Sequence, residues 1–421
     1  MHTTYIEKLN ERVVRATTPS GLEILIVPKP GFHKTEIHLA ISFGSNDEND
    51  GAASGEAFPI GTAHFLEHML FEAGETDPTA AFARLGAQVN AYTSFDATVY
   101  YFSTTEDERT ALDLLFDLVF TPEIPAAAVE KERDIISREI RMYEDDVNDL
   151  IYEDLLNAMY QTNPVKNPIA GTVASIAAID ATVLKNAHAV YYLPANAHVV
   201  VVGDVDPEAV IAAIEAHPAV RMNERRRPVR QITPEDHVPA KRFVEKKKDI
   251  KNDLLMLGIK FDRPNGQTAF ENDLEEIKWA FLLDSLFGKA SLSYQDLIRK
   301  RLVNDAFEAS AQSEPDFGHV VLYTETKKPQ AAMKAIWALF DDATSLIDDT
   351  RFLTAKRRLL GNYIRTFHNI SALAGFLLDY ALSGVDVFEL IAAIDAIERT
   401  DLIDLIPKLQ KNARTAILYR R

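Results

Sequence analysis

Apolar and polar positions follow regular patterns along most of this chain. Near the start, GLEILIVPKP and KTEIHLAISFGS are rich in β-branched residues and are bounded by proline and glycine, which is typical of strands. The run GTAHFLEHMLFE at residues 61–72 carries apolar residues around most of a helical circumference, which indicates a helix buried on most sides. The next segments, AQVNAYTSF and ATVYYFSTT, alternate like paired strands.

Helical periodicity takes over after these strands. We predict one helix from about Asp107 to Phe120, and a second that starts after Pro125 and continues through VEKERDIISREIRMYEDD toward Tyr160. The segment NAHVVVVGDV then reads as a buried strand that closes the first half of the chain.

The second half repeats this order of elements. Residues 219–240 are polar, contain several prolines and lack periodicity, which predicts a linker. We therefore predict an α+β fold of two homologous α/β-sandwich halves, each a mostly antiparallel sheet covered by helices. The predicted domains are residues 1–218, with a metal-binding motif, and residues 241–421, without one.

Composition narrows the class of protein. A length of 421 residues favours two or three domains, and the net charge of −18 argues against nucleic-acid binding. We find no signal peptide and no membrane-spanning run, so we expect a cytoplasmic protein without a membrane contact. The chain has no cysteine, so that any metal must be held by His, Asp or Glu.

The buried helix contains the first candidate chemistry. His64, Glu67 and His68 lie at i, i+3 and i+4, so they share one helix face. Two neutral imidazoles at this spacing can bind one zinc ion, and Glu67 can take a proton from a water on the metal. The order H-x-x-E-H is the inverzincin motif. The alternative is a pair of core histidines with satisfied hydrogen bonds beside a surface glutamate.

A later helix offers a third ligand. Glu132 and Glu139 lie on its predicted apolar stripe, about 10 Å apart along the axis, so both cannot easily bind one ion. One is expected to be the ligand and the other a supporting or substrate-facing residue, and spacing does not decide which. The alternative is a partly exposed face with ordinary charge pairs. The stripe consists of Val129, Ile136, Ile140, Tyr143 and Val147.

Three segments, HFLEHMLFE, LGAQVNAYTSFDATVYYF and VEKERDIISREIRMYEDD, together resemble the pitrilysin/insulinase family of zinc peptidases, which includes the mitochondrial processing peptidase. The resemblance implies that Glu139 is the third zinc ligand and that Glu132 is needed for activity without binding zinc. It also implies that Asn90 contacts substrate, although Asn90 could merely cap a turn. The implied activity is endopeptidase cleavage of unstructured peptides, which enter by adding a strand to a sheet edge.

One departure from the family concerns the second half. Members that work as complete enzymes have an Arg and a Tyr seven residues apart there, whereas Arg299 is followed at that offset by Ala306, and Lys300 by Phe307. The chain thus resembles the short bacterial members that pair with a related zinc-less subunit. We expect a homodimer, or a heterodimer whose partner supplies the missing pair. The alternative function is a non-catalytic peptide-binding or structural subunit.

Overall fold

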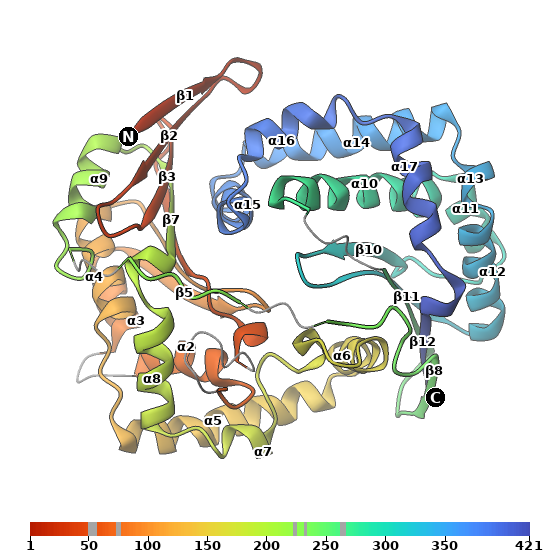
Figure 1. The fold of residues 1–421 in the computed structure, drawn as a ribbon, viewed down its shortest axis with the longest axis horizontal. Helices are drawn as coiled ribbons and strands as arrows, with labels where there is room; N and C mark the ends of the chain where they lie inside the picture. Colours follow the sequence, from red (N-terminus) through yellow and green to blue (C-terminus); the bar gives the residue numbers. More distant parts are fainter. Residues whose placement is uncertain (49–56, 73–76, 222–224, 231–233, 262–266) are drawn as a thin grey trace. The chain divides into compact units, whose positions relative to one another are not determined.

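The computed structural model describes residues 1–48, 57–72, 77–221, 225–230, 234–261 and 267–421. These residues form two compact units, each with its own sheet (Figure 1). Unit 1 comprises Met1–Met142, Asn167–Gln231 and Ile364–Gly384, and unit 2 comprises Tyr143–Lys166, Ile232–Tyr363 and Val385–Arg421. Neither unit is continuous in sequence. The predicted domain boundaries stay a prediction, and residues 222–224 and 231–233 of the predicted linker lie outside the described residues.

Unit 1 contains a seven-stranded sheet in the order β1-β2-β3-β7-β4-β6-β5. Its strands are β1 (His2–Ile6), β2 (Glu11–Thr17), β3 (Glu23–Pro28), β4 (Thr35–Ile41), β5 (Ala87–Thr93), β6 (Thr98–Thr104) and β7 (Ala197–Gly203). All neighbours are antiparallel except β3 and β7. The central strands β4 and β7 are buried along their whole length, and β5 forms one edge.

Helices cover this sheet. They are α2 (Thr62–Glu72), α3 (Pro78–Arg84), α4 (Glu108–Phe120), α5 (Ala126–Asp145), α7 (Val173–Ile176), α8 (Ala181–Tyr191), α9 (Pro207–Ala216) and α15 (Ile370–Ser383). α2 packs against α8 and β5. α15 comes from much later in the chain, yet it packs on β4 and β7, where Ser371 hydrogen-bonds the buried Glu36.

Unit 2 contains a five-stranded sheet in the order β10-β11-β9-β12-β8, with only β12 and β8 parallel. Its strands are β8 (Phe243–Lys247), β9 (Asp253–Lys260), β10 (Glu308–Ser313), β11 (Gly318–Thr326) and β12 (Arg414–Arg420). Its helices are α6 (Val147–Met159), α10 (Ala269–Phe287), α11 (Leu292–Arg299), α12 (Pro329–Asp341), α13 (Ala343–Leu346), α14 (Asp349–Thr366), α16 (Val387–Ile394) and α17 (Arg399–Leu405).

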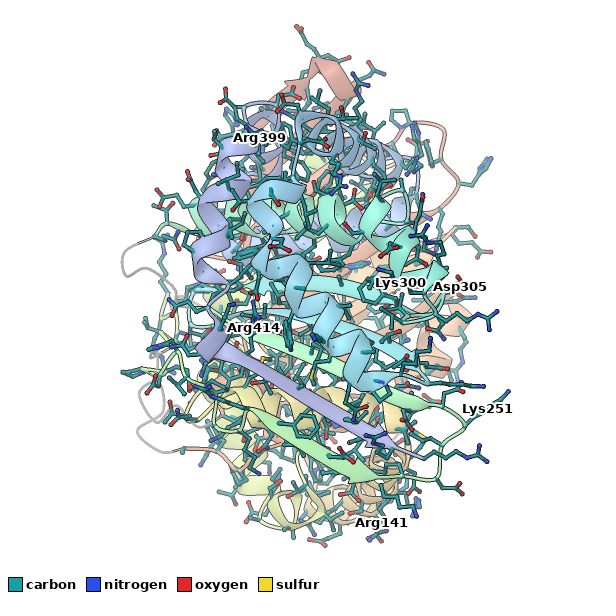
Figure 2. The ribbon with its side chains drawn as sticks, turned by 90° about the vertical axis from the view of Figure 1, so that its right-hand side faces the viewer. Arg141, Lys251, Lys300, Asp305, Arg399 and Arg414 are labelled. Atoms are coloured by element: carbon teal, nitrogen blue, oxygen red, sulfur yellow. The ribbon has the colours of Figure 1, made fainter. Side chains whose placement is uncertain are left out.

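Close packing fixes the helices on this second sheet. α6 lies so near β9 that a Cβ on Gly258 would stand 2.4 Å from Met159 Sδ, so a larger residue there would require the Met159 side chain to move. Arg414, at the start of β12 in Figure 2, places its guanidinium over the ring of Trp337 at 4.8 Å and pairs with Asp341 of α12.

Short 3₁₀ helices occur in both units. They cover Glu7–Leu9, Ser45–Asp47, Pro164–Lys166, Pro194–Asn196, Ile406–Lys408 and Lys411–Ala413.

The predicted fold class is confirmed, since both halves are mostly antiparallel sheets with helices on them. The prediction of one helix from Pro125 toward Tyr160 is wrong. Asp146 interrupts it, because its side chain accepts a hydrogen bond from Asn148 N and so caps a new helix, α6. Val147 therefore begins α6 and does not extend the stripe of α5. Within the described part of the chain, no helix is long and apolar enough to cross a membrane.

Candidate active site

Helix α2 presents the H-x-x-E-H motif from a mostly buried position. Phe65, Leu66 and Met69 are fully buried, as the apolar pattern predicts. The helix begins where the buried carboxylate of Glu48 accepts hydrogen bonds from Gly61 N (2.9 Å) and Ala63 N (2.8 Å). These amides have no partner within the helix, so Glu48 holds the first turn of α2 in place.

Helix α5 supplies the two glutamates. Val129, Ile136 and Ile140 are buried and define its inner face, as predicted. Glu132 is only 2% exposed, whereas the side chain of Glu139 is 21% exposed. Both carboxylates therefore point inward from a helix whose outer face is charged.

The two helices bring a possible ligand set together. Glu139 lies 3.7 Å from His64 Nε2 and 3.2 Å from His68 Nε2, and the ligand atoms of these three residues all lie within 4.8 Å of one another. Two imidazole nitrogens and one carboxylate form a donor set that zinc prefers in catalytic sites. The residues present thus fit the metal that the sequence motif predicts.

Glu132 lies on the other side of the same histidine. Its Oε1 is 2.9 Å from His68 Nδ1, so it contacts the ring nitrogen that faces away from Glu139. A carboxylate in this place fixes the tautomer and orientation of a metal-binding imidazole. The geometry gives Glu139 the position of a ligand and Glu132 that of a supporting residue, a choice that spacing left open.

Burial and hydrogen bonding set different proton affinities for the two histidines. Burial lowers the pKa of His64 to about 4, with a further contribution from the charge of His68. Burial would also lower the pKa of His68, but the hydrogen bonds to Glu132 and Glu139 outweigh it and raise this pKa to about 10. In the metal-free protein at neutral pH, His64 is neutral and His68 carries a proton on both nitrogens.

Glu67 lies on the same face of α2. Its Oε2 accepts a hydrogen bond of 2.6 Å from Thr93 Oγ1, at the end of strand β5. Burial raises the pKa of Glu67, while the hydrogen bond from Thr93 acts in the opposite direction. A carboxylate with a raised pKa beside a metal-ligand cluster has the properties of a general acid or base.

Asn90 lies on β5, the edge strand next to this group. Its side chain is exposed, and its Oδ1 accepts a hydrogen bond from Ala91 N at 2.9 Å. The amide of Ala91 thus bonds to a side chain, and among the described residues β5 pairs with one strand, β6. Asn90 lies within the strand and not in a turn.

Sequence reasoning missed two residues of this site. Thr93 lies three positions after Asn90 in the segment NAYTS, and its β-strand alternation could have indicated that it faces the helices. Glu48 gave no signal, because its hydrogen bonds to Gly61 and Ala63 join residues 13 and 15 positions apart, which no periodic pattern indicates.

The second-half residues at the Arg–Tyr offset make local contacts. Phe307 is 5% exposed, and its ring packs against Phe287 at 5.7 Å. Arg299 ends α11 and pairs with Asp296, and Lys300, labelled in Figure 2, also pairs with Asp296 at 2.6 Å. These charges are engaged locally.

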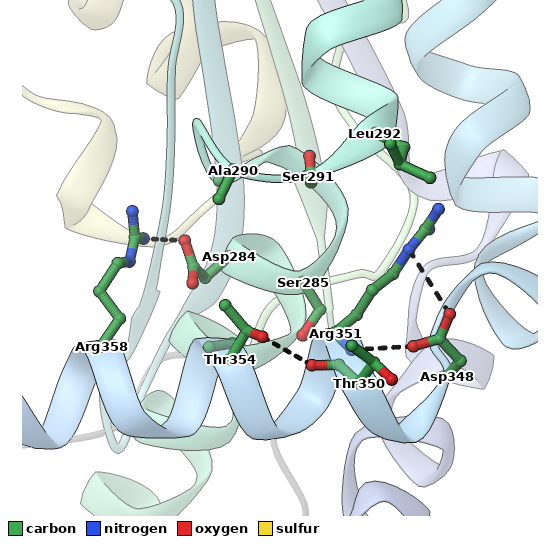
Figure 3. A pocket seen from close by; sticks show the side chains of 12 residues that line it. Asp284, Ser285, Ala290, Ser291, Leu292, Asp348, Thr350, Arg351, Thr354 and Arg358 are labelled. Carbon is green, nitrogen blue, oxygen red and sulfur yellow. Dashed lines mark hydrogen bonds and ion pairs between the residues drawn. The ribbon is translucent and has the colours of Figure 1, made fainter.

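Unit 2 also contains a pocket of about 230 Å³ between the end of α10, the start of α11 and α14 (Figure 3). Its charged side chains pair with one another: Arg358 with Asp284, and Arg351 with Asp348. Because these charges are already compensated, the pocket does not indicate a charged ligand.

Comparisons with known proteins identify the family to which this chain belongs. Residues 23–173 match the model of the insulinase family (peptidase family M16), and residues 178–359 match that of the M16 inactive domain. The chain is 30% identical over 410 residues to the uncharacterized zinc protease YmfH of Bacillus subtilis, covering 95% of this chain and 94% of that protein. It is 32% identical over 220 residues to the uncharacterized zinc protease Mb2805c of Mycobacterium bovis, about half of each chain.

Solved structures show the same architecture. An M16-like peptidase from Alicyclobacillus acidocaldarius superimposes with a TM-score of 0.91 at 28% identity, over 99% of both chains. A protease from Helicobacter pylori superimposes with a TM-score of 0.84 at 21% identity, over 98% of this chain and 100% of that one, which shows the fold alone.

Proposed function

Because this chain belongs to the insulinase family of peptidases, family M16, we propose that it is a zinc-dependent endopeptidase acting on unstructured peptides. The observation that supports this most strongly is the convergence of His64, His68 and Glu139 with Glu67 beside them. Relatives that bear the name zinc protease support the choice of metal.

In this proposal, His64, His68 and Glu139 hold the zinc. A bound zinc ion supplies a Lewis acid, which lowers the pKa of a water and polarises a peptide carbonyl. Glu67 takes the proton of the attacking water and delivers it to the leaving amine. Glu132 keeps the ring of His68 oriented through its 2.9 Å contact with Nδ1.

The substrate is proposed to bind along β5. An extended peptide can add to the open edge of this strand through backbone hydrogen bonds, which recognise any sequence in extended form. Asn90 would contact this peptide, because in the absence of a substrate its side-chain oxygen accepts the hydrogen bond of the Ala91 backbone N–H. A folded protein cannot offer such a free strand, so unstructured peptides are the proposed substrate class.

The test compares two glutamates of the same helix. We expect Glu67→Gln to keep its zinc and to lose chelator-sensitive cleavage of a quenched peptide, because the amide cannot accept a proton. Glu72→Gln is the matched control, since Glu72 is on the surface and pairs with Lys131 at 2.7 Å; we expect it to retain both. Cleavage by the Glu67 variant at the rate of the control would remove Glu67 from the role of base.

A second candidate function is a non-catalytic peptide-binding or structural subunit, which the absent Arg–Tyr pair favours. We propose instead that a related zinc-less subunit, or a second copy of this chain, completes the enzyme. The intact set of His64, Glu67, His68, Glu132 and Glu139 supports the catalytic role. Metal analysis combined with the cleavage assay separates the two functions, because a purely structural subunit would not cleave with any partner.

A further inference from the structure

We propose that Thr93 is a positioning residue, which ties the orientation of Glu67 to the edge strand β5. The inference rests on the proposed function, because Glu67 is the base of that reaction. Thr93 Oγ1 donates to Glu67 Oε2 at 2.6 Å. One carboxylate oxygen is thereby held in place, which leaves the other to carry the proton.

The backbone of Thr93 is itself well anchored. Thr93 is the last residue of β5 and is paired with Thr98 of β6. Thr98 is fully buried, and its hydroxyl donates to the carbonyl of Phe43 at 2.8 Å. The hydroxyl that holds Glu67 thus comes from a rigid sheet end and not from a mobile loop.

Nearby hydroxyls do not replace this contact. Tyr100 and Tyr192 are buried near Glu67, but their hydroxyls bond to each other at 2.8 Å. Burial raises the pKa of both tyrosines, with a smaller contribution from the charge of Glu67. Among the described residues, Thr93 is the one side chain that donates a hydrogen bond to Glu67.

This contact links substrate binding with the chemistry. A peptide that adds to the open edge of β5 pairs with the backbone of the strand whose last side chain orients Glu67. Side chains alternate along a strand, so Asn90 and Thr93 project to opposite faces. One strand therefore presents its edge to the peptide and its Thr93 hydroxyl to the base.

The first arm of the test measures kinetics. Thr93→Val keeps the β-branched shape and removes the hydroxyl, and we expect kcat to fall by about 10–100-fold with KM and zinc content unchanged. Thr93→Ser keeps the hydroxyl and should stay within about threefold of the wild type. Thr17→Val, an exposed threonine of β2, is the matched control and should leave kcat unchanged. An equal loss in Thr93→Ser and Thr93→Val would overturn the role of the hydroxyl.

The second arm needs neither zinc nor activity. In chelator-treated protein, a double-mutant cycle of Thr93→Val with Glu67→Ala should show a coupling of about tenfold in the unfolding equilibrium constant. A coupling below about twofold would overturn the proposal whatever the kinetics. A clear coupling in a protein that cleaves no peptide, either alone or with a related zinc-less subunit added, would uphold the contact and refute the proposed peptidase function, so that the two failures are distinguishable.

Discussion

Glu132 and Glu139, both on helix α5, contact different ring nitrogens of His68. Nε2 faces Glu139 at 3.2 Å, and Nδ1 faces Glu132 at 2.9 Å. An imidazole that binds a metal through one nitrogen gains basicity and a fixed orientation from a carboxylate on the other. The seven-residue spacing of the glutamates thus places one carboxylate beside each ring nitrogen of His68.

This division of roles predicts a graded loss of metal. We expect Glu132→Gln to weaken zinc binding by about 10–100-fold, as is usual for a residue behind a ligand. Glu139→Gln should weaken it further and leave the purified protein without stoichiometric zinc. Glu144→Gln, exposed on the same helix, is the control and should keep full occupancy. Metal analysis after dialysis measures all three; full zinc in the Glu139 variant would contradict the assignment.

The histidine pKa values predict that zinc binding releases a proton. His68, with a pKa of about 10, carries an extra proton at pH 7.5 that must leave Nε2 before a metal can bind, whereas His64 is already neutral. About one proton should therefore be released per zinc, and zinc affinity should fall about tenfold for each unit of pH decrease near neutrality.

Calorimetric titration of chelator-treated protein, in two buffers of different ionisation enthalpy, counts this proton. Glu132→Gln removes one of the hydrogen bonds that raise the pKa of His68, so this variant should release a smaller fraction of a proton. Zinc binding without any proton release would show that His68 is neutral in the free protein.

At this scale the sequence was informative where chemistry depends on local spacing. His64, Glu67 and His68 could be grouped because one helix turn brings them together. The choice between Glu132 and Glu139 needed the family resemblance, since it depends on how α5 is rotated against α2. The contact of Thr93 with Glu67 joins a strand to a helix across 26 residues of sequence. Periodicity within either segment does not indicate which residues of the two come into contact.

At the scale of elements, a segment of the predicted linker is fastened by one carboxylate. Glu235 accepts backbone hydrogen bonds from Gln161, Thr162 and Asn163, and its Oε1 lies 2.7 Å from Lys260 Nζ. Its pKa is lowered to about 2: burial opposes this, but the hydrogen bonds from Lys260 and from these amides outweigh it. Glu235 thus joins residues 234–238, the end of α6 and strand β9.

We expect Glu235→Gln to destabilise the protein by about 2 kcal/mol, because a charged acceptor of several hydrogen bonds becomes neutral. The sign with pH follows from the lowered pKa. The unfolded glutamate takes up a proton near pH 4–5, and the folded one only near pH 2, so the stabilisation is complete above about pH 5 and is lost as pH falls toward 2.

Urea unfolding at pH 7 and pH 4 tests this expectation, with the exposed Glu123→Gln as the control. The difference in unfolding free energy between the Glu235 variant and the wild type should shrink at pH 4. An unchanged difference, or a variant as stable as the control at pH 7, would show that the contact does not stabilise the fold.

Elements with a strong internal pattern were predictable, including the edge strand β5, whereas the exposed edge strands β1 and β8 were not. The buried strands β4 and β7 and the helices α2 and α4 have clear apolar patterns, because the residues that are buried in the fold are apolar. Strands β1 and β8 are mostly exposed, so they lack a buried face that would produce such a pattern. The break between α5 and α6 rests on a single cap at Asp146, within an otherwise continuous periodicity.

At the scale of the whole molecule, the order of elements predicted two similar halves, but not which segments pack together. Helix α15 belongs by sequence to the second half and packs on β4 and β7 of unit 1. Helix α6 belongs to the first half and packs on β9 and β12 of unit 2. Hydrophobic periodicity shows that a helix needs a partner surface, but it does not say which sheet provides it.

The site residues that each half contributes lead to a prediction about the assembly. All proposed zinc ligands belong to unit 1, while in the second half Arg299 and Lys300 are followed at the seven-residue offset by Ala306 and the buried Phe307, so the Arg–Tyr pair is not present in the sequence. Zinc binding should therefore be a property of the single chain, whereas efficient cleavage should depend on a partner. We expect the purified chain to bind one zinc per subunit and to cleave a quenched peptide poorly.

Adding a related zinc-less subunit that carries the Arg–Tyr pair should then raise the chelator-sensitive rate by at least about tenfold, since residues that position a substrate contribute several kcal/mol to the barrier. Substitution of that Tyr by Phe in the added subunit is the control and should abolish most of the gain. If a second copy of this chain completes the enzyme instead, the rate per subunit should rise with protein concentration and saturate. A fast rate that is independent of concentration and of any added subunit would show that the single chain is the complete enzyme, and that the missing Arg–Tyr pair is not required.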